Sequence, residues 1–193
     1  MTRSPIPGST GGVRGMRVYG DPVLHTAARE ATAADGPLDA LVEDLFATMY
    51  AHSGVGLAAP QIGVPLRVFV YDCPDDEDVR HRGYLINPRL AHTGGMLLRE
   101  PEGCLSLPGL EAGTVRCDEA TAEGSDLEGA PLRVSGTGFF ARCLQHELDH
   151  LDGTVYPDRV SGLRRRRVLR AARRTEWWGA ESWTAVAGAG AAR

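Results

Sequence analysis

The stretch CLQHELDHLDG, residues 143–153, contains the pattern His-Glu-x-x-His. Residues three and four apart share one face of an α-helix, so His146 and His150 can converge on one metal ion with Glu147 beside it. A catalytic site of this kind requires three protein ligands and an open fourth position. Either these are two ordinary helical histidines, or a third ligand comes from elsewhere in the chain.

The surrounding residues predict a helix that begins after Thr137, a favourable N-cap, and ends at Gly153, a residue type common just past a helix C-terminus. The side chains of this helix form two stripes along its length. One joins Phe139 and Cys143 to the two histidines and can face a site. The other is apolar and can pack into the core; it consists of Phe140, Leu144, Leu148 and Leu151.

The rest of the chain predicts two further helices and several short strands. Apolar spacing predicts a helix from Leu38 to Met49, with Asp35 as its N-cap, and an arginine-rich helix over 160–178. Runs rich in β-branched residues predict strands at 66–72 and 83–88, separated by a polar loop, and shorter ones around 95–99, 112–117 and 131–134. We therefore expect an α+β fold in which short antiparallel or mixed sheets pack around a central helix at 137–153.

Length and composition favour one domain. The 193 residues are 42% hydrophobic, and no linker divides them, so we expect a single catalytic domain at 16–178 between a flexible tail at 1–15 and a low-complexity tail at 179–193. The formal net charge is −4, although seven arginines and no acidic residue lie between 164 and 174. No apolar run approaches the ~20 residues that span a bilayer, and the four cysteines do not form a disulfide framework. These features favour a cytoplasmic protein with no membrane contact.

A zinc protease is the obvious alternative. One protease pattern continues His-Glu-x-x-His-x-x-Gly-x-x-His; Gly153 matches it, but Tyr156 stands at the last position. All other histidines lie upstream, so this pattern does not supply the third ligand. An endopeptidase and a non-catalytic module with a structural metal both stay open.

Two upstream stretches offer the missing chemistry. Cys104, in EGCLS (102–106), can ligate zinc or ferrous iron as a thiolate, although a single cysteine is more often a small buried hydrophobe. In GVGLAAPQ (54–61), the glycines allow close backbone approach and Gln61 can donate to a developing oxyanion. No G-K-[ST] follows, so this is not a phosphate loop.

Together, GVGLAAPQ, EGCLS and QHELDH (145–150) resemble the three ordered motifs of the peptide deformylases, G-x-G-L-A-A-x-Q, E-G-C-L-S and Q-H-E-x-x-H. The resemblance covers about residues 16–160. It implies that Cys104, His146 and His150 hold one divalent metal ion with water as fourth ligand. It also implies Fe²⁺ in the cell, with Zn²⁺, Ni²⁺ or Co²⁺ possible in purified protein.

The resemblance further implies hydrolysis of the N-terminal formyl group of formyl-methionyl peptides, with release of formate. Glu147 would be the general base and acid for the attacking water. The Gln61 amide and the Leu105 backbone N–H would stabilise the oxyanion. Gln145 would orient Cys104 or its loop.

The same resemblance implies a substrate that pairs as a strand with the backbone near Val55 and Gly56. The methionine pocket would be lined by Val55, Phe139, Cys143 and His146, with Glu102 and Gly103 at its edge. Core packing is an equal alternative for Phe139 and Cys143. The basic helix at 160–178 would contact the ribosome or be a solvated face, and the chain would be a monomer.

Overall fold

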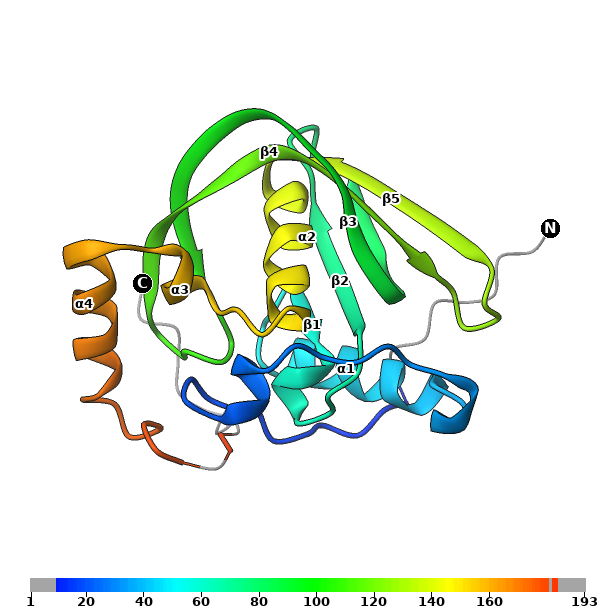
Figure 1. The fold of residues 1–193 in the computed structure, drawn as a ribbon, viewed down its shortest axis with the longest axis horizontal. Coiled ribbons are helices and arrows are strands. Elements are labelled where there is room, and N and C mark those ends of the chain that lie inside the picture. Colours follow the sequence, from blue (N-terminus) through cyan, green and yellow to red (C-terminus); the bar gives the residue numbers. More distant parts are fainter. Residues whose placement is uncertain (1–9, 181, 184–193) are drawn as a thin grey trace.

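The computed structural model describes residues 10–180 together with 182 and 183. Five strands form one antiparallel sheet in the order β1-β2-β3-β4-β5, and helices cover it (Figure 1), which confirms the α+β class. The strands are β1 Gly56–Ala58, β2 Val68–Pro74, β3 Arg80–Gly103, β4 Glu111–Ser125 and β5 Pro131–Thr137. The α-helices are α1 Asp39–Ala51, α2 Gly138–Leu151, α3 Tyr156–Arg159 and α4 Gly162–Ala172, and the 3₁₀ helices are η1 Pro22–His25, η2 Ala33–Asp35 and η3 Ala59–Ile62.

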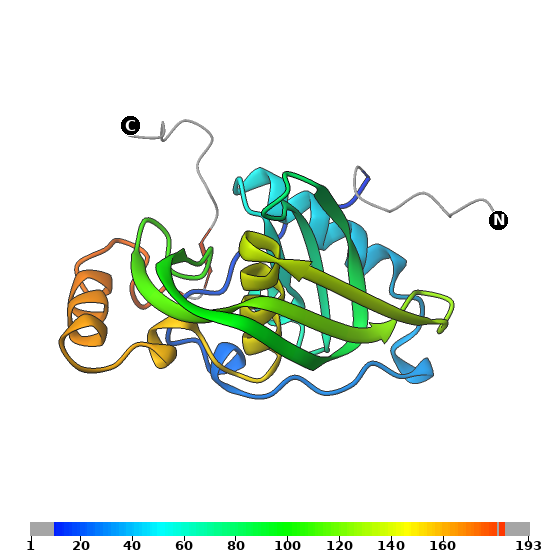
Figure 2. The ribbon, with the colours of Figure 1, turned by 90° about the horizontal axis from the view of Figure 1, so that it is seen from above.

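The sheet is antiparallel, one of the two predicted arrangements, but its strands are not all short. The predicted strands at 83–88 and 95–99 are both parts of β3, which is 24 residues long and pairs with β4. Pro88 and Gly95 lie where the β3–β4 register shifts. Such bulges bend a strand without ending it. Residues that the sequence presents as strand breaks therefore shape one long, curved ribbon (Figure 2).

Helix α2 packs its apolar stripe into the main core, as predicted. Phe140, Leu144, Leu148 and Leu151 are all buried against residues of β2, β3 and β4. The sheet curves around this helix (Figure 1), so the opposite stripe faces the turn that follows β3. The fold thereby fixes the helix on which the His-Glu-x-x-His pattern lies.

The predicted helix boundaries were wrong in two places. Asp35 ends η2 and does not cap α1, because Gly36 has a φ of 73° and turns the chain before the helix begins at Asp39. Helix α4 ends at Ala172 rather than near 178, and both the backbone N–H and the hydroxyl of Thr175 donate to the Ala172 carbonyl. Within the described ranges, no helix has the length and apolar content needed to cross a membrane.

Both predicted tails contain ordered contacts. Gly12 donates its backbone N–H, and Arg14 its guanidinium, to Asp44 of α1, so part of the segment predicted to be a flexible tail contacts that helix. Met16 and Trp183 exchange two backbone hydrogen bonds of 2.7 Å. The predicted low-complexity tail therefore includes a residue that pairs with the domain. Residues 1–9 and 184–193 lie outside the described residues.

Candidate metal centre

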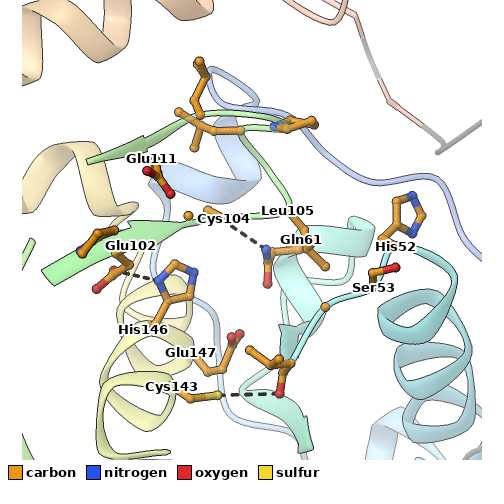
Figure 3. Close-up of a pocket in the computed structure, with 18 of the residues that line it drawn as sticks. His52, Ser53, Gln61, Glu102, Cys104, Leu105, Glu111, Cys143, His146 and Glu147 are labelled. Atoms are coloured by element: carbon orange, nitrogen blue, oxygen red, sulfur yellow. Dashed lines mark hydrogen bonds and ion pairs between the residues drawn. The ribbon is translucent and has the colours of Figure 1, made fainter. Parts of the chain in front are cut away.

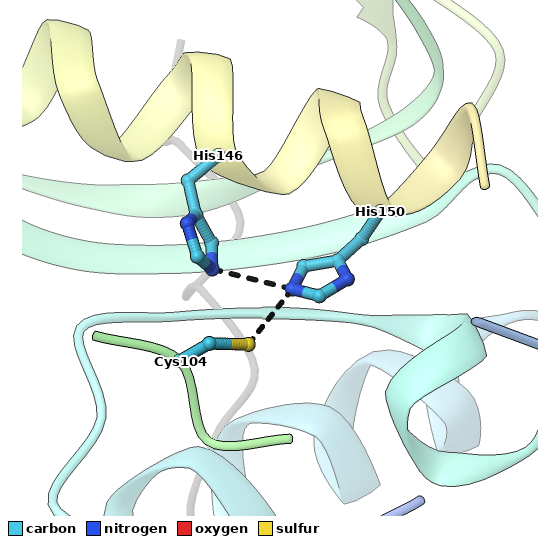
Figure 4. A group of neighbouring side chains, drawn as sticks. All are labelled: Cys104, His146 and His150. Atoms are coloured by element: carbon cyan, nitrogen blue, oxygen red, sulfur yellow. Dashed lines mark hydrogen bonds between the residues drawn. The ribbon is translucent and has the colours of Figure 1, made fainter. Parts of the chain in front are cut away.

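Two elements bring three potential ligands together (Figure 4). Helix α2 carries His146 and His150 one turn apart, and Cys104 lies directly after β3. The Nε2 atoms of the two histidines are 3.2 Å apart, and Cys104 Sγ is 3.1 Å from His150 Nε2. All three donor atoms lie within 4.8 Å of one another.

These distances suit a single tetrahedral ion. An ion about 2.0–2.1 Å from each nitrogen and about 2.3 Å from the sulfur separates the nitrogens by about 3.3 Å and sulfur from nitrogen by about 3.5 Å. The two separations from His150 Nε2, to His146 Nε2 and to Cys104 Sγ, are slightly shorter than this, so a small outward adjustment there would accommodate the ion. Two imidazoles and one thiolate suit Zn²⁺, Fe²⁺, Ni²⁺ and Co²⁺ alike.

The two imidazoles differ in their surroundings. Nδ1 of His146 lies 2.8 Å from Glu102 Oε1, which fixes the ring with Nε2 toward Cys104 and His150. Burial lowers the pKa of His146, but hydrogen bonds to Cys104 and Glu102 outweigh it, so the pKa is raised well above its usual value. Burial, followed by the neighbouring His146, lowers the pKa of His150 well below its usual value. This lowering favours the neutral imidazole of His150, the form that binds metals.

A buried ion network that the sequence did not reveal stands behind His146. Arg116 donates from Nε and Nη2 to Glu102 and from Nη1 to Asp149 of α2, at 2.6–3.0 Å. Arg142 adds a 3.0 Å contact to Glu102. Burial opposes ionisation of Glu102, but Arg116 and His146 outweigh it and hold its pKa well below the usual range. No local motif signals this network, because its members come from β3, β4 and α2.

Glu147 lies beside the histidines with its carboxylate buried. An added Cβ on Gly56 would lie 2.3 Å from Glu147 Oε1, so the close approach of β1 to α2 requires glycine there. Among the described residues, Glu147 Oε2 has no hydrogen-bond partner. Burial, the largest effect, raises the pKa of Glu147 to about 7, opposed by His146 and assisted by Glu102. A buried carboxylate with a free oxygen can bind and deprotonate a water.

Gln61 faces the same point from η3 (Figure 3). Its Oε1 accepts from the Ala58 backbone at 2.9 Å, which directs the amide nitrogen toward Cys104 Sγ, 3.6 Å away, and Ser106 Oγ, 3.3 Å away. Among the residues with described positions, none accepts a hydrogen bond from the Leu105 backbone N–H. The Gln61 amide therefore lies next to Cys104, and the Leu105 N–H belongs to the residue that follows it.

A pocket with a volume of about 710 Å³ opens over these groups. Its lining includes every residue proposed from sequence for substrate contact, base or oxyanion stabilisation: Val55, Gly56, Gln61, Glu102, Gly103, Leu105, Phe139, Cys143 and Glu147. Phe139 is 44% exposed and outside the core, whereas Cys143 lines the pocket and also belongs to the main core. Figure 3 shows His52 and Ser53 on the α1 side, across from Glu102 and His146.

One expectation about an individual residue was wrong. Gln145 does not contact Cys104; its amide accepts from the Cys117 N–H and donates to the Cys117 carbonyl, which joins α2 to β4. The sequence gave no sign that His52 would line the pocket. The sequence also gave no sign of Trp183 in the pocket wall, because it lies 79 residues after Cys104 in an Ala- and Gly-rich segment.

Comparisons with known proteins agree with this geometry. Residues 13–166 match the sequence profile of the family described as Polypeptide deformylase. The chain is 65% identical over 177 residues to Peptide deformylase 2 of Streptomyces avermitilis, covering 92% of this chain and 95% of that protein. It is 60% identical to Peptide deformylase 2 of Streptomyces coelicolor, covering 92% and 99%. A peptide deformylase structure from Synechococcus elongatus, in complex with actinonin, superposes with a TM-score of 0.77 at 31% identity, covering 92% of this chain and 98% of that one.

Proposed function

The chain belongs to the peptide deformylase family, and we propose that it hydrolyses the N-terminal formyl group of formyl-methionyl peptides, releasing formate and a free amine. The observation that supports this proposal best is the grouping of Cys104, His146 and His150 beside the free carboxylate oxygen of Glu147. We take residues 16–178 as the catalytic domain.

We propose that Cys104, His146 and His150 hold one divalent ion, Fe²⁺ in the cell. Such an ion supplies a Lewis acid that activates water and polarises a carbonyl oxygen. Glu102 holds His146 in the tautomer whose Nε2 is free to ligate, because it accepts from Nδ1. Arg116 and Arg142 keep Glu102 ionised for this task.

Glu147 is the proposed general base and acid. Its unpartnered oxygen faces the space beside the ligand triad, where it can take a proton from the attacking water. The same carboxyl then gives the proton to the leaving amine. A pKa near neutrality favours both halves of this transfer.

The Gln61 amide and the Leu105 N–H are the proposed donors to the oxyanion that develops on the formyl oxygen. Gln61 is buried, and its orientation is set by the Ala58 contact, so little reorganisation is needed. Leu105 N–H has no competing acceptor among the described residues. Fixed donors of this type usually contribute more than mobile ones.

The peptide is proposed to bind as an added strand along β1. Strand β1 is at the sheet edge and, among the residues that the structure describes, pairs only with β2, which leaves its other side toward the pocket. The methionine side chain would lie between Val55, Phe139, Cys143 and His146, with Glu102 and Gly103 at the edge. The apolar members of this set suit a thioether.

We further propose that α4 contacts ribosomal RNA. All seven arginines between 164 and 174 are exposed, which suits phosphate contact and not base recognition. The substrates are nascent chains, so we place the reaction in the cytosol and treat the enzyme as a monomer. Sedimentation with ribosomes in rising salt tests this contact: binding that weakens steeply with salt and is lost on replacing Arg164–Arg167 by glutamine supports it, and salt-independent binding contradicts it.

The reaction itself is tested by loading apo-protein with Fe²⁺ under anaerobic conditions, or with Ni²⁺, and measuring formate release from formyl-Met-Ala-Ser. Glu147→Ala is the matched control. Rapid release that is absent in the variant supports both the reaction and the base. Cleavage within unformylated peptides would favour an endopeptidase, and bound metal without any turnover would favour a structural metal site.

A further inference from the structure

One aromatic residue in the wall of the pocket, Trp183, lies outside residues 13–166, the part of the chain that matches the deformylase family. Trp183 lines the same pocket as Gln61, Cys104 and Glu147. Its backbone is held by the two hydrogen bonds to Met16, which is fully buried. The position of Trp183 is thus set by pairing with the domain.

The indole is packed on two sides. Its ring centroid lies 5.3 Å from that of His52, at an interplanar angle of 52°. It also packs against the core cluster under α1 and against the cluster that includes Cys104 and Leu107. Trp183 is nevertheless only partly buried, so part of its apolar surface faces the pocket.

This surface lies at the outer end of the proposed substrate strand. From Gly56 the chain leads back through Val55 and Ser53 to His52, away from Glu147 and the ligand triad, and Figure 3 shows His52 and Ser53 at that end. A pocket of about 710 Å³ has the size that accommodates a short peptide. Leu105, Pro108 and Leu110 also line it, so its wall beyond the triad is largely apolar.

Resting on the proposed function, we infer that Trp183 and His52 form an aromatic subsite for the side chain of a residue downstream of formyl-methionine, and that this subsite favours peptides with a large apolar or aromatic residue there. Aromatic walls bind such side chains through area burial and ring contacts. Acidic and small side chains would gain little binding energy from such a wall. The C-terminal segment would thereby set which nascent chains are processed fastest.

The test compares kcat/KM for two peptide series, formyl-Met-X-Ala and formyl-Met-Ala-X, with X as Ala, Leu, Phe or Glu. The wild type should favour Leu and Phe over Ala and Glu in one series. Trp183→Ala should reduce that preference about three- to tenfold, mainly through KM, and Trp183→Phe should keep most of it. Trp178→Ala is the matched control, since Trp178 stacks on Tyr19 and does not line the pocket, and its preference should equal that of the wild type.

Equal preferences in wild type and Trp183→Ala, or no preference in the wild type, would overturn the subsite. Failure of the proposed function would look different: no formate from formyl-Met-Ala-Ala despite bound metal. The subsite is then tested by calorimetric binding of Met-Phe-Ala, Met-Ala-Phe and Met-Ala-Ala to the wild type and Trp183→Ala. Tighter binding of one Phe peptide to the wild type that is lost in the variant supports the subsite, and equal binding of all three peptides to the wild type contradicts it.

Discussion

Oε1 of Glu102 lies 2.8 Å from Nδ1 of His146, and this contact joins the end of β3 to helix α2 at the ligand triad. Cys104 is two residues beyond Glu102, so one short segment supplies both a ligand and the carboxylate that orients another. A displacement of this segment would therefore move Cys104 and also remove the contact that orients the His146 ring.

We expect Glu102→Ala to weaken metal binding about 10–100-fold, the usual effect of removing a hydrogen-bond partner of a ligating histidine. Glu102→Gln should be milder, because its amide oxygen can still accept from His146 Nδ1. Competition with a chelator for Zn²⁺ or Co²⁺ measures the affinity. Equal affinity in wild type and Glu102→Ala would show that the contact does not support the site.

Arg116→Met should destabilise the fold by about 3–5 kcal/mol, because it leaves Glu102 and Asp149 buried without their shared cation. Arg89→Met is a matched control: Arg89 is 79% exposed and pairs with Glu123, so its loss should cost at most about 1 kcal/mol. Urea unfolding of the apo forms measures both. A similar loss of unfolding free energy in the two variants would show that burial does not make the Arg116 ion pairs more important than the exposed Arg89 pair.

Glu147→Gln should lower kcat/KM about 10²–10⁴-fold with metal content unchanged, since the amide keeps the shape of the side chain but cannot take a proton. Formate release and metal analysis of the same sample separate the two effects. Loss of metal together with activity would instead assign Glu147 a role in holding the site together.

Gln61 has two separable roles, and two variants distinguish them. Gln61→Glu keeps the acceptor for the Ala58 N–H but removes the amide donor near Cys104. We expect kcat to fall about 10²–10³-fold in both Gln61→Glu and Gln61→Ala. Only Gln61→Ala should also lower the melting temperature of the apo-protein, because it leaves the buried Ala58 N–H unpaired. Nearly wild-type kcat in Gln61→Glu would rule out the donor role.

Local patterns were enough to predict helix α2. Its two stripes, its end at Gly153 and its histidine spacing all follow from residues within one segment, and the structure shows each of them. The three motifs likewise indicated which side chains would meet in one pocket. Such features depend on short-range spacing, which a single sequence displays directly.

Long-range features were not visible in the same way. Pro88 was interpreted as a strand end because proline lacks an N–H donor, but a bulge in β3 accommodates it. Arg116 and Asp149 are 33 residues apart and showed no pattern before the sheet brought them together. The pairing of Met16 with Trp183 spans nearly the whole chain, so no local signal could indicate that the C-terminal segment reaches the pocket.

Asp72 allows a pH-dependent test of what stabilises the segment around Val55, along which the peptide is proposed to bind. Its backbone N–H donates to the Val55 carbonyl at 2.8 Å, and its carboxylate accepts from Arg80 at 2.5 Å and from Tyr50 at 2.5 Å. Burial alone would raise the pKa of Asp72, but the hydrogen bonds from Arg80 and Tyr50 outweigh it, so the pKa is lowered.

A carboxyl group with a lowered pKa in the folded state stabilises the protein above its unfolded pKa of about 3.9, and this contribution is lost as the pH falls toward the folded value. Asp72→Asn should therefore cost about 1–3 kcal/mol at pH 7, and the cost should shrink below about pH 4. Urea unfolding of both forms from pH 7 to 3 measures the difference, with Glu128→Gln, an exposed turn carboxylate, as control. If the cost of Asp72→Asn instead grew as the pH fell, burial would outweigh the hydrogen bonds from Arg80 and Tyr50, and the ionised Asp72 would destabilise the fold.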